Sequence, residues 1–344
     1  MPIINDLWRA LLAAAPNREA RLLKKVNRLL KRSYLRERNS AAVWDVLWDK
    51  LLFANAMAVV AEPAVDAIRR NGCFADPASL RDKSWNLVQE GRHQYRAVGT
   101  NAKRWNRGLL PGPHTTVALK GSPKALKRLF AIRELGCRYQ TGLDSRLSQA
   151  CSRQLKAPLD VGLWQEIRRS IFPIPMQDPA VGLIGHSVAI TTAQHMVLDL
   201  GFPTLKPDIW FTRFHAAATG APPAPNRAIT LASLETLEAW LAARVAEIDY
   251  SDKFLKRLKI DLVRKAPFRF ADLVIAKFGM TPDPSWGIEI SPTELDSRIL
   301  RTRLAGIRDA MAQCEASRRR CREDKQNEKN AGAAKSKEKR RDLR

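Results

Sequence analysis

A chain of 344 residues, 45% of them hydrophobic, is long enough for about two domains and for a substantial core, which excludes a disordered protein. Its 59 Lys and Arg outnumber 35 Asp and Glu, and the net charge of +24 favours a polyanionic partner, with nucleic acid as the first candidate. No apolar run exceeds six residues, far short of the roughly 18 to 20 that cross a bilayer. The start MPIINDLWRA has no signal-peptide core. We therefore expect a cytoplasmic protein without a membrane partner.

The cysteines do not form a metal-binding pattern. They are odd in number and widely scattered, with no CxxC and no Cys/His cluster at zinc or iron–sulfur spacing: Cys73, Cys137, Cys151, Cys314 and Cys321. Free thiols in a reducing compartment are the expected state. The sequence predicts no metal and no other cofactor.

The N-terminal third of the chain reads as helical. Residues 18–38 place Leu22, Val26, Leu29 and Leu30 at helical spacing among nine Lys and Arg, which predicts an apolar stripe with a basic opposite face. Between residues 43 and 61 apolar side chains occupy nearly every side of a helix, as in a central, buried element. Trp44, Trp48 and Trp85 are expected to be packing residues.

Later in the chain, helical segments alternate with short Pro/Gly turns, and only residues 115–119 show the period-two alternation of a strand. The predicted class is therefore all-α. The end of the chain, residues 317–344, has twelve Lys or Arg, five Asp or Glu and no aromatic residue, which predicts a disordered basic tail. Without that tail the body still carries a net charge of +17, so a cationic fold is expected.

The most informative stretch is residues 181–220. Gly182 and Gly185 form a tight turn before an amphipathic helix, where free backbone amides and the helix dipole favour an anion such as phosphate. A second turn over residues 201–207 leads to Asp208, placed to cap the next helix. Turn glycines and an N-cap aspartate need no further function, and this structural alternative stays open for the stretch taken alone. Trp210, one turn later, is expected in the core.

The order of these features resembles the helix-hairpin-helix DNA glycosylase superfamily, which includes endonuclease III, the adenine mismatch glycosylases and the 8-oxoguanine glycosylases. The family's hairpin core, Leu-Pro-Gly-Val-Gly, corresponds to Gly182-Leu183-Ile184-Gly185, in which the last glycine matches and the earlier one is shifted. The family's catalytic aspartate, in a Val-Asp-Thr-His context, corresponds to Asp208 in Lys206-Pro207-Asp208-Ile209.

A second part of the resemblance lies upstream. The family's Leu-Leu-Ser-Ala-Gln-Ala-Thr is similar to Leu51-Leu52-Phe53-Ala54-Asn55-Ala56-Met57, which puts Asn55 in place of a Gln that reaches into the DNA near the vacated base. The family's Gly-x-x-x-x-Lys-Ala turn is similar to residues 98–103, ending at Lys103. The matched parts are 43–108 and 176–220, with 109–175 as additional sequence.

The resemblance implies a monofunctional enzyme. Bifunctional members carry a Schiff-base lysine two residues after the last hairpin glycine, where this chain has Ser187, which cannot form an imine. Asp208 is the expected catalytic residue, and Lys206 is expected to contact phosphate. His186 and His195 could contact phosphate or carry a proton, but both lie on a helix with ordinary core neighbours, which favours packing. The residues expected to bind double-stranded DNA are Gly182, Ile184, Gly185, His186, Ser187, Lys206, Asn55 and Lys103.

The implied organisation is a two-lobed helical glycosylase-like fold, acting as a monomer. Residues 1–40 would pack with the C-terminal lobe, 41–204 would form a helical barrel domain with the insertion 109–175 and the hairpin 181–187, and 205–316 would form the C-terminal lobe. The substrate would be a damaged or modified base, with a bulky modified base such as those of viral DNA as one candidate.

Two other functions remain open. The first is a non-catalytic DNA- or RNA-binding protein with the same basic helices, and the second is a ribosome or RNA assembly factor, which rests on charge alone. Excision of a base separates the enzyme from both, whereas binding does not, because every one of these proteins would bind in a salt-dependent way.

Overall fold

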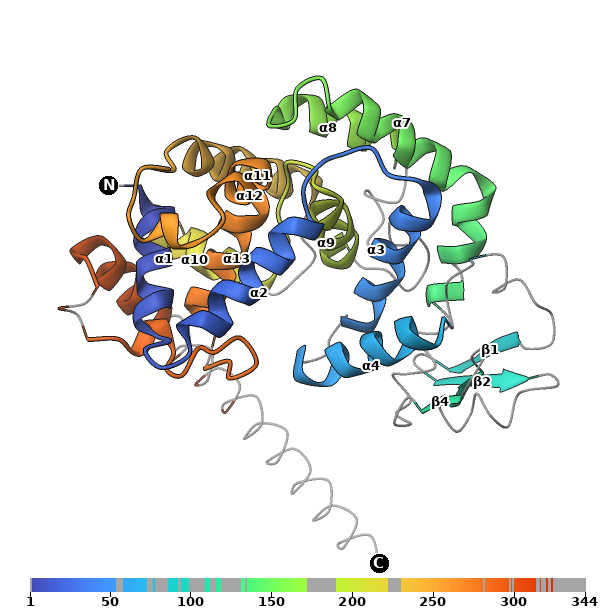
Figure 1. Ribbon diagram of the computed structural model, residues 1–344, viewed down its shortest axis with the longest axis horizontal. Coiled ribbons are helices and arrows are strands. Elements are labelled where there is room, and N and C mark those ends of the chain that lie inside the picture. Colours follow the sequence, from blue (N-terminus) through green and yellow to red (C-terminus); the bar gives the residue numbers. More distant parts are fainter. Residues whose placement is uncertain are drawn as a thin grey trace, which may run out of the picture.

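The computed structural model describes residues 2–53, 58–72, 77, 86–91, 94–98, 109–111, 116–118, 131–133, 135–171, 190–221, 230–280, 282–296, 298, 300–313, 316, 320 and 323. These residues are mostly helical (Figure 1), which confirms the predicted helical class. The described α-helices are α1 Ile3–Ala13, α2 Glu19–Arg32, α3 Ser40–Phe53, α4 Ala58–Asn71, α7 Asp144–Gln154, α8 Val161–Ile171, α9 Ile190–Leu200, α10 Ile209–Thr219, α11 Leu231–Ala246, α12 Ile260–Lys265 and α13 Pro267–Gly279. A π-helical turn spans Tyr139–Leu143, 3₁₀ turns span Leu255–Arg257 and Pro292–Glu294, and residues 302–313 are also helical.

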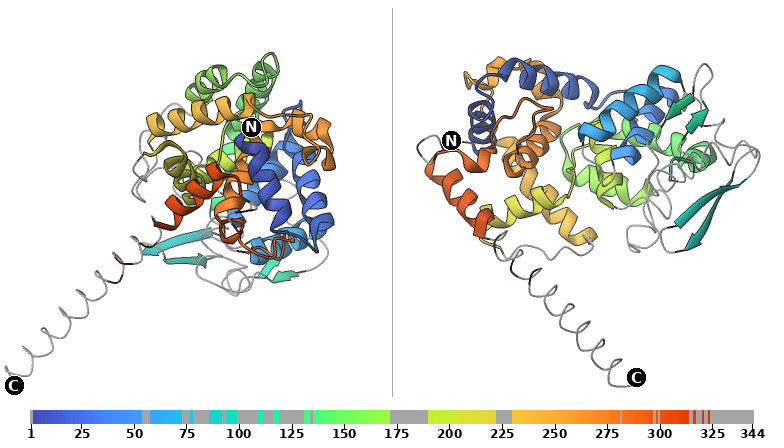
Figure 2. Two further views of the ribbon diagram at one scale, coloured as in Figure 1. Left: turned by 90° about the vertical axis from the view of Figure 1, so that its left-hand side faces the viewer. Right: turned by 90° about the horizontal axis from the view of Figure 1, so that it is seen from below.

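Besides the helices, the described residues form two small antiparallel β-hairpins. Strand β1 (Asn86–Gly91) pairs with β2 (Gln94–Val98), and β3 (Leu109–Pro111) pairs with β4 (Thr116–Ala118). The strand β4 lies where the sequence shows its one stretch of alternation. Strand β1 carries a register shift between Gln89 and Gly91, which interrupts a regular alternation. The hairpins lie at the end of the molecule farthest from α1 (Figure 2).

The helices gather into two groups (Figures 1 and 2). The first contains α1, α2 and α10 to α13, in which α13 contacts α1, α10, α11 and α2. The second contains α3, α4, α7, α8 and α9, in which α3 contacts α4, α7 and α9. Contacts between α13 and α9 and between α11 and α8 join the groups. The N-terminal helices α1 and α2 thus pack with elements from the C-terminal half of the chain.

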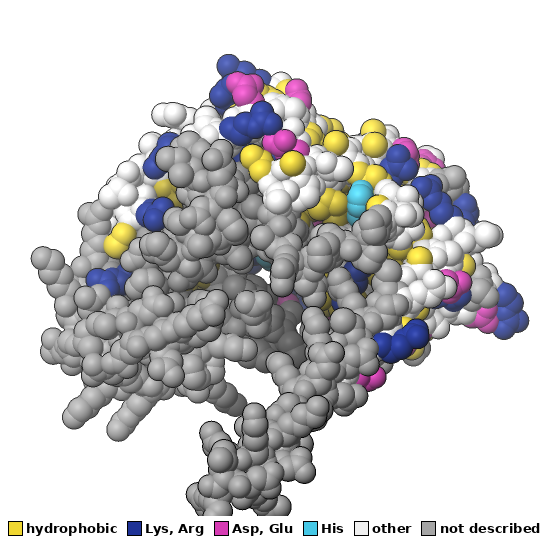
Figure 3. Space-filling view, turned by 180° about the vertical axis from the view of Figure 1, so that it is seen from behind, with side chains coloured by type: hydrophobic (Ala, Val, Ile, Leu, Met, Phe, Trp, Pro, Cys, Tyr) yellow, Lys and Arg dark blue, Asp and Glu magenta, His cyan; other side chains and the backbone are white. Residues whose placement is uncertain are grey.

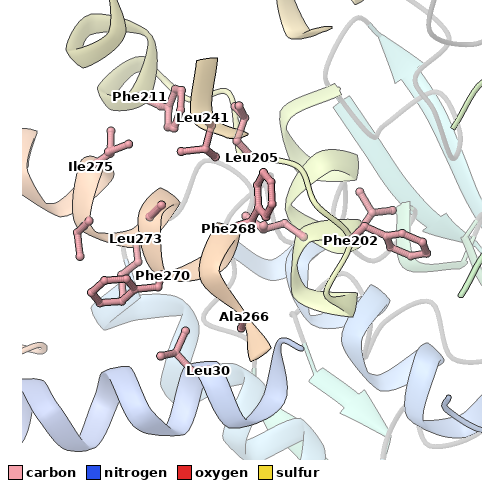
Figure 4. Packing of buried hydrophobic residues seen from close by; sticks show 14 of the residues in the cluster. Leu30, Phe202, Leu205, Phe211, Leu241, Ala266, Phe268, Phe270, Leu273 and Ile275 are labelled. Carbon is pink, nitrogen blue, oxygen red and sulfur yellow. The ribbon is translucent and has the colours of Figure 1, made fainter. Parts of the chain in front are cut away.

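Helix α13 is the centre of the first group because nearly all of its residues are buried, and Pro267 at its first turn suits the fixed φ of proline. Figure 4 shows side chains from several helices meeting there, with Leu30 approaching from α2. Trp8 of α1 contacts the ring of Phe270 edge to face at 5.7 Å and donates its Nε1–H to the carbonyl of Phe254.

Helix α2 has the predicted amphipathic character. Leu22, Val26 and Leu30 are buried against the core, and Leu29 is partly buried. The opposite side exposes most of its basic residues, Arg21, Lys24, Arg28, Lys31 and Arg32. The basic face is therefore available to a ligand, as the spacing predicts.

Helix α3 is buried as expected for a central element. Trp44 and Trp48 are enclosed, and their packing role is confirmed, whereas Trp85 lies outside the described residues. The segment predicted as one helix over 43–61 contains two helical stretches, since α3 ends at Phe53 and α4 begins at Ala58. The apolar residues on all sides of this segment therefore belong to two helices that pack against each other.

Cys137 and Cys151 are free thiols, as expected, and burial raises the pKa of Cys151 to about 11. In the described part of the chain no helix is both long and apolar enough to cross a bilayer. Most of the predicted tail, residues 317–344, lies outside the described residues.

Candidate active site

Asp208 is the N-cap of α10, as the sequence predicts. Its backbone is extended (φ −86°, ψ 177°), and its Oδ1 accepts from the amides of Trp210 at 2.9 Å and Phe211 at 3.0 Å. These two amides have no partner within the helix, and the helix dipole favours a negative charge at this end. The side chain is 18% exposed, so the carboxylate reaches solvent.

Lys206 lies between two carboxylates. Its Nζ is 3.3 Å from Oδ2 of Asp208, and its backbone amide donates to Oδ1 of Asp272 at 2.8 Å. The ammonium group is 34% exposed, at the same opening as Asp208. The predicted phosphate-contacting residue and the predicted catalytic residue therefore lie side by side.

Asp272 is buried on α13 beneath this opening. Its Oδ2 pairs with Arg269 Nη1 at 2.8 Å. Burial raises the pKa of Asp272 to about 6, and the negative charge of Asp208 acts in the same direction, whereas Arg269 acts against it. Asp272 therefore fixes the backbone of Lys206 from inside the protein, two residues before Asp208.

Arg269 connects Asp272 to α9. Its Nε lies 2.7 Å from Oδ1 of Asp199, and its Nη2 donates to Nε2 of His195 at 3.2 Å. Asp199 also forms an ion pair with Lys50 of α3. Burial alone would raise the pKa of Asp199, but the charges of Arg269 and Lys50 outweigh it and hold that pKa well below its usual range.

His195 is part of this network rather than of an ordinary apolar core, which corrects the expectation from sequence. Burial, aided by the charges of Lys50 and Lys206, puts the pKa of His195 well below its usual value, although Asp199 opposes the shift. The imidazole is therefore neutral and accepts the hydrogen bond from Arg269, which places its own N–H on Nδ1. We call Lys50, His195, Asp199, Arg269 and Asp272 the buried charge network.

The network was missed from sequence because each member lies on a helix that reads as core. One signal does exist, since Lys50, Asp199 and Arg269 are charges within strongly apolar helices, where a charge requires a partner. The network extends further to the surface of the second group of helices. Lys50 Nζ is 3.1 Å from Asp49, and Arg69 of α4 is 2.7 Å from the same carboxylate.

Lys25 of the basic helix α2 and Lys277 of α13 both lie beside the ring of Trp286. Lys277 of α13 is buried and bonded to Asp283, and burial together with the charges of Lys206 and Lys25 lowers its pKa. Lys25 of α2 also pairs with Glu62 of α4 at 3.0 Å. Helix α2 thus contacts both α13 of the first group and α4 of the second group.

The expectation that Trp210 lies in the core is wrong, because the residue is only partly buried, beside the partly exposed N-cap Asp208. A Cβ added to Gly279 would lie 3.0 Å from the ring of Trp210. The guanidinium of Arg213 lies 5.0 Å from the ring centroid. The remaining predicted site residues lie outside the described residues: Asn55, Lys103, Gly182, Ile184, Gly185, His186 and Ser187.

Among the described residues there is no group of three or more His, Cys, Asp or Glu that could hold a metal ion. No family model, no curated protein and no solved structure matches the chain. Functional conclusions therefore depend on the geometry around Asp208 and on the sequence pattern.

Proposed function

We propose that the protein is a monofunctional DNA glycosylase that removes a damaged or modified base, with Asp208 as its catalytic residue. The supporting observation is the arrangement of the Asp208 carboxylate. Oδ1 is fixed by two helix amides, while Oδ2 faces Lys206 at a partly exposed position. A carboxylate held in one orientation at an opening can act on a bound sugar without reorganising.

The reaction breaks the bond between C1′ and the base nitrogen and forms a bond between C1′ and the oxygen of water. The electron pair of the broken bond leaves with the base, which takes up a proton. As the bond lengthens the sugar becomes positively charged, and the Asp208 carboxylate stabilises that charge. The same carboxylate orients the water and accepts its proton.

The base must leave the duplex to reach such a site, which costs a few kcal/mol of stacking and pairing. Contacts to phosphates supply the compensating free energy. Lys24, Arg28 and Lys31 form an exposed row along one side of α2, a helix that contacts α13. On the face seen in Figure 3, by contrast, the described Lys and Arg side chains are interspersed with Asp and Glu.

The proposed fold is the two-lobed arrangement of the helix-hairpin-helix glycosylases, with the hairpin at residues 181–187. The two groups of helices support it, together with the position of Asp208 at the start of α10, close to the contact between α13 of the first group and α9 of the second. The site lies near the contact between α9 and α13, where the two groups meet. A duplex bound across this junction would bring an extruded nucleotide to Asp208.

A non-catalytic nucleic-acid-binding protein is the second candidate. It is favoured by one observation, namely that both oxygens of Asp208 already have partners within the protein. In that case Asp208 would serve as a helix cap and Lys206 as a phosphate contact.

The decisive experiment replaces Asp208 with Asn, which retains the capping ability and removes the charge. We expect Asp208→Asn to keep DNA binding and to lose excision by a factor of about 10² to 10⁴. The matched control is Asp160→Asn, because Asp160 accepts from the amide of Leu163 at the start of α8, away from the site. Excision is measured as free base by mass spectrometry after incubation with genomic DNAs of different modification chemistry. Equal excision by wild type and Asp208→Asn would remove Asp208 from the mechanism, and no free base from any DNA would favour the binding protein.

A further inference from the structure

A pocket of about 430 Å³ opens where four connections of the chain meet. It is lined by the segment between α2 and α3, the segment between α7 and α8, the end of α9 and the junction of α12 with α13. The volume falls within the range of small-molecule sites in proteins. Asp208 is not among the lining residues, so the pocket differs from the candidate active site.

The walls of the pocket are apolar. Their exposed apolar surface comes from Pro158 and Leu159, beside the partly buried Tyr34. The other apolar lining residues, Leu35, Leu198, Phe202 and Phe268, are buried. Leu159 is 52% exposed and is one of the few large apolar side chains of the described residues that face solvent. An apolar group bound against Pro158 and Leu159 would cover this surface.

One side of the pocket is strongly cationic. Arg264 and Lys265 line it and are exposed. Tyr34, another lining residue, has the Arg36 guanidinium 4.5 Å from its ring centroid and accepts at its hydroxyl from Arg36 Nη1 at 2.8 Å. Arg38 donates to the backbone carbonyls of Arg32 and Tyr34. We call Arg36, Arg38, Arg264 and Lys265 the basic rim.

The four residues of the basic rim form no ion pair with a carboxylate within the described residues. Their partners there are aromatic rings, a hydroxyl and carbonyl oxygens. Arg38 Nε is buried without a hydrogen-bond partner. Arg269, which also lines the pocket, is by contrast already paired with Asp199 and Asp272.

The titration of neighbouring groups reflects this excess of positive charge. A hydrogen bond from Arg36, with the charges of Lys265 and Arg38, lowers the pKa of Tyr34. Burial and the charge of Arg36 lower the pKa of Arg38 to about 10. A bound anion would relieve the repulsion among these cations.

We propose that this pocket binds a nucleotide unit, with the base against Pro158 and Leu159 and the phosphate at the basic rim. An anion without an apolar body would leave Pro158 and Leu159 in water, and an apolar ligand without an anion would leave the four cations without a counter-charge. The unit can be a free mononucleotide or one residue of a single strand. The proposal does not depend on the glycosylase activity.

The test measures binding to the full chain by isothermal titration calorimetry with four probes: a 5′-mononucleotide, the matching nucleoside, inorganic phosphate and a short single-stranded oligonucleotide. We expect the mononucleotide, or the oligonucleotide if the source is a strand, to bind at least about tenfold more tightly than nucleoside or phosphate. Lys265→Gln and Leu159→Asp should each weaken that binding about fivefold or more. Lys256→Gln, an exposed lysine outside the pocket, should leave it unchanged.

Three results would overturn the proposal. The first is the absence of binding by both phosphate-bearing organic probes. The second is binding of inorganic phosphate with the same affinity as the mononucleotide, which would indicate a simple anion site. The third is an affinity for the mononucleotide or oligonucleotide that neither Leu159→Asp nor Lys265→Gln changes. Such a result would mean that the probe binds elsewhere, for example to the basic face of α2. Because both substituted residues are exposed, we expect the variants to fold, and thermal unfolding monitored by circular dichroism checks this.

Discussion

The backbone amide of Lys206 donates to the buried carboxylate of Asp272 across 2.8 Å. This bond connects the turn before α10 to the central helix α13, and it fixes the chain two residues before the N-cap Asp208. The position of the exposed carboxylate thus depends on a buried one, which in turn depends on Arg269.

The Asp272→Ala variant tests how much the hydrogen bond and ion pair of Asp272 contribute to the free energy of unfolding. The substitution leaves the Lys206 amide and the Arg269 guanidinium without their buried acceptor, so we expect a loss of about 3 to 5 kcal/mol in the free energy of unfolding. Urea denaturation at neutral pH measures it. Arg298→Ala is the control, because Arg298 pairs with Asp296 at 88% exposure and its loss should cost at most about 1 kcal/mol. Similar losses for both variants would contradict a structural role for the buried pair.

The raised pKa of Asp272 predicts a particular pH dependence. Its pKa is about 6 in the folded state and 3.8 in the reference state, so between these values only the folded state holds the proton. Unfolding then releases a proton, and the contribution of Asp272 to stability falls as pH rises from about 4 to about 6, by at most about 3 kcal/mol. Below about pH 4 the contribution is fully present.

Two other groups act in the opposite direction. The lowered pKa values of His195 and Asp199 mean that their contributions are lost as pH falls, below about 6.5 for the histidine and below about 4 for the aspartate. A plot of total stability against pH therefore contains contributions of opposite sign, and it does not isolate the contribution of Asp272. The direct measurement is carboxyl ¹³C NMR of Asp-labelled protein, in which we expect one resonance that titrates near pH 6 and disappears in Asp272→Asn. An Asp272 carboxyl that titrates near 4 would contradict the expectation.

The helical class, the amphipathic α2 and the N-cap at Asp208 could be predicted because each depends on local spacing. A repeat of three and four residues places Leu22, Val26 and Leu30 on one face whatever the rest of the chain does. An aspartate after proline and before an apolar segment finds the free amides of the helix start.

The buried charge network could not be predicted, because its members come from α3, α9 and α13, which lie far apart in sequence. Nothing near Lys50 in the sequence indicates that it meets Asp199. The same applies to the pocket, whose basic rim is assembled from residues 36–38 and 264–265. Tertiary packing decides which residues from distant segments become partners. The spacing of residues within one segment carries no information about them.

Gly201 provides a test of the close contact between the end of α9 and the segment after α2. Its φ is +101°, and an added Cβ would lie 2.0 Å from the backbone nitrogen of Leu35. We expect Gly201→Ala to destabilise the protein by more than about 3 kcal/mol, or to prevent folding. Gly142→Ala is the matched control, because Gly142 has a φ of +114° but nothing within 4 Å of an added Cβ. The control should cost only about 1 to 2 kcal/mol, measured by chemical denaturation. Equal losses of stability in Gly201→Ala and Gly142→Ala would show that the positive φ, and not the close contact with Leu35, determines the effect.

The basic face of α2 predicts a measurable dependence of DNA binding on salt. Replacing Lys24, Arg28 and Lys31 with Gln should reduce the slope of log Kobs against log salt concentration by about 2 to 3, if each residue neutralises one phosphate. Fluorescence anisotropy with a labelled duplex gives the slope. The control replaces Arg153 of α7 and Arg169 of α8, which are exposed and paired with Glu166 of α8 and Glu235 of α11. A slope unchanged in the α2 variant would place the duplex elsewhere.

Lys206 allows a test of the proposed reaction type. A lysine that attacked C1′ would form an imine, which borohydride reduces to a stable protein–DNA adduct. The Nζ of Lys206 lies 3.3 Å from the Asp208 carboxylate, and an ammonium held in this ion pair has no free electron pair for attack. We therefore expect no trapped adduct with a DNA from which the base is excised, and abasic sites that break only after alkali treatment. An adduct that persists in wild type and disappears in Lys206→Gln would instead identify Lys206 as a nucleophile and the enzyme as bifunctional. Lys253→Gln, an exposed lysine beside Phe254, controls for general loss of charge.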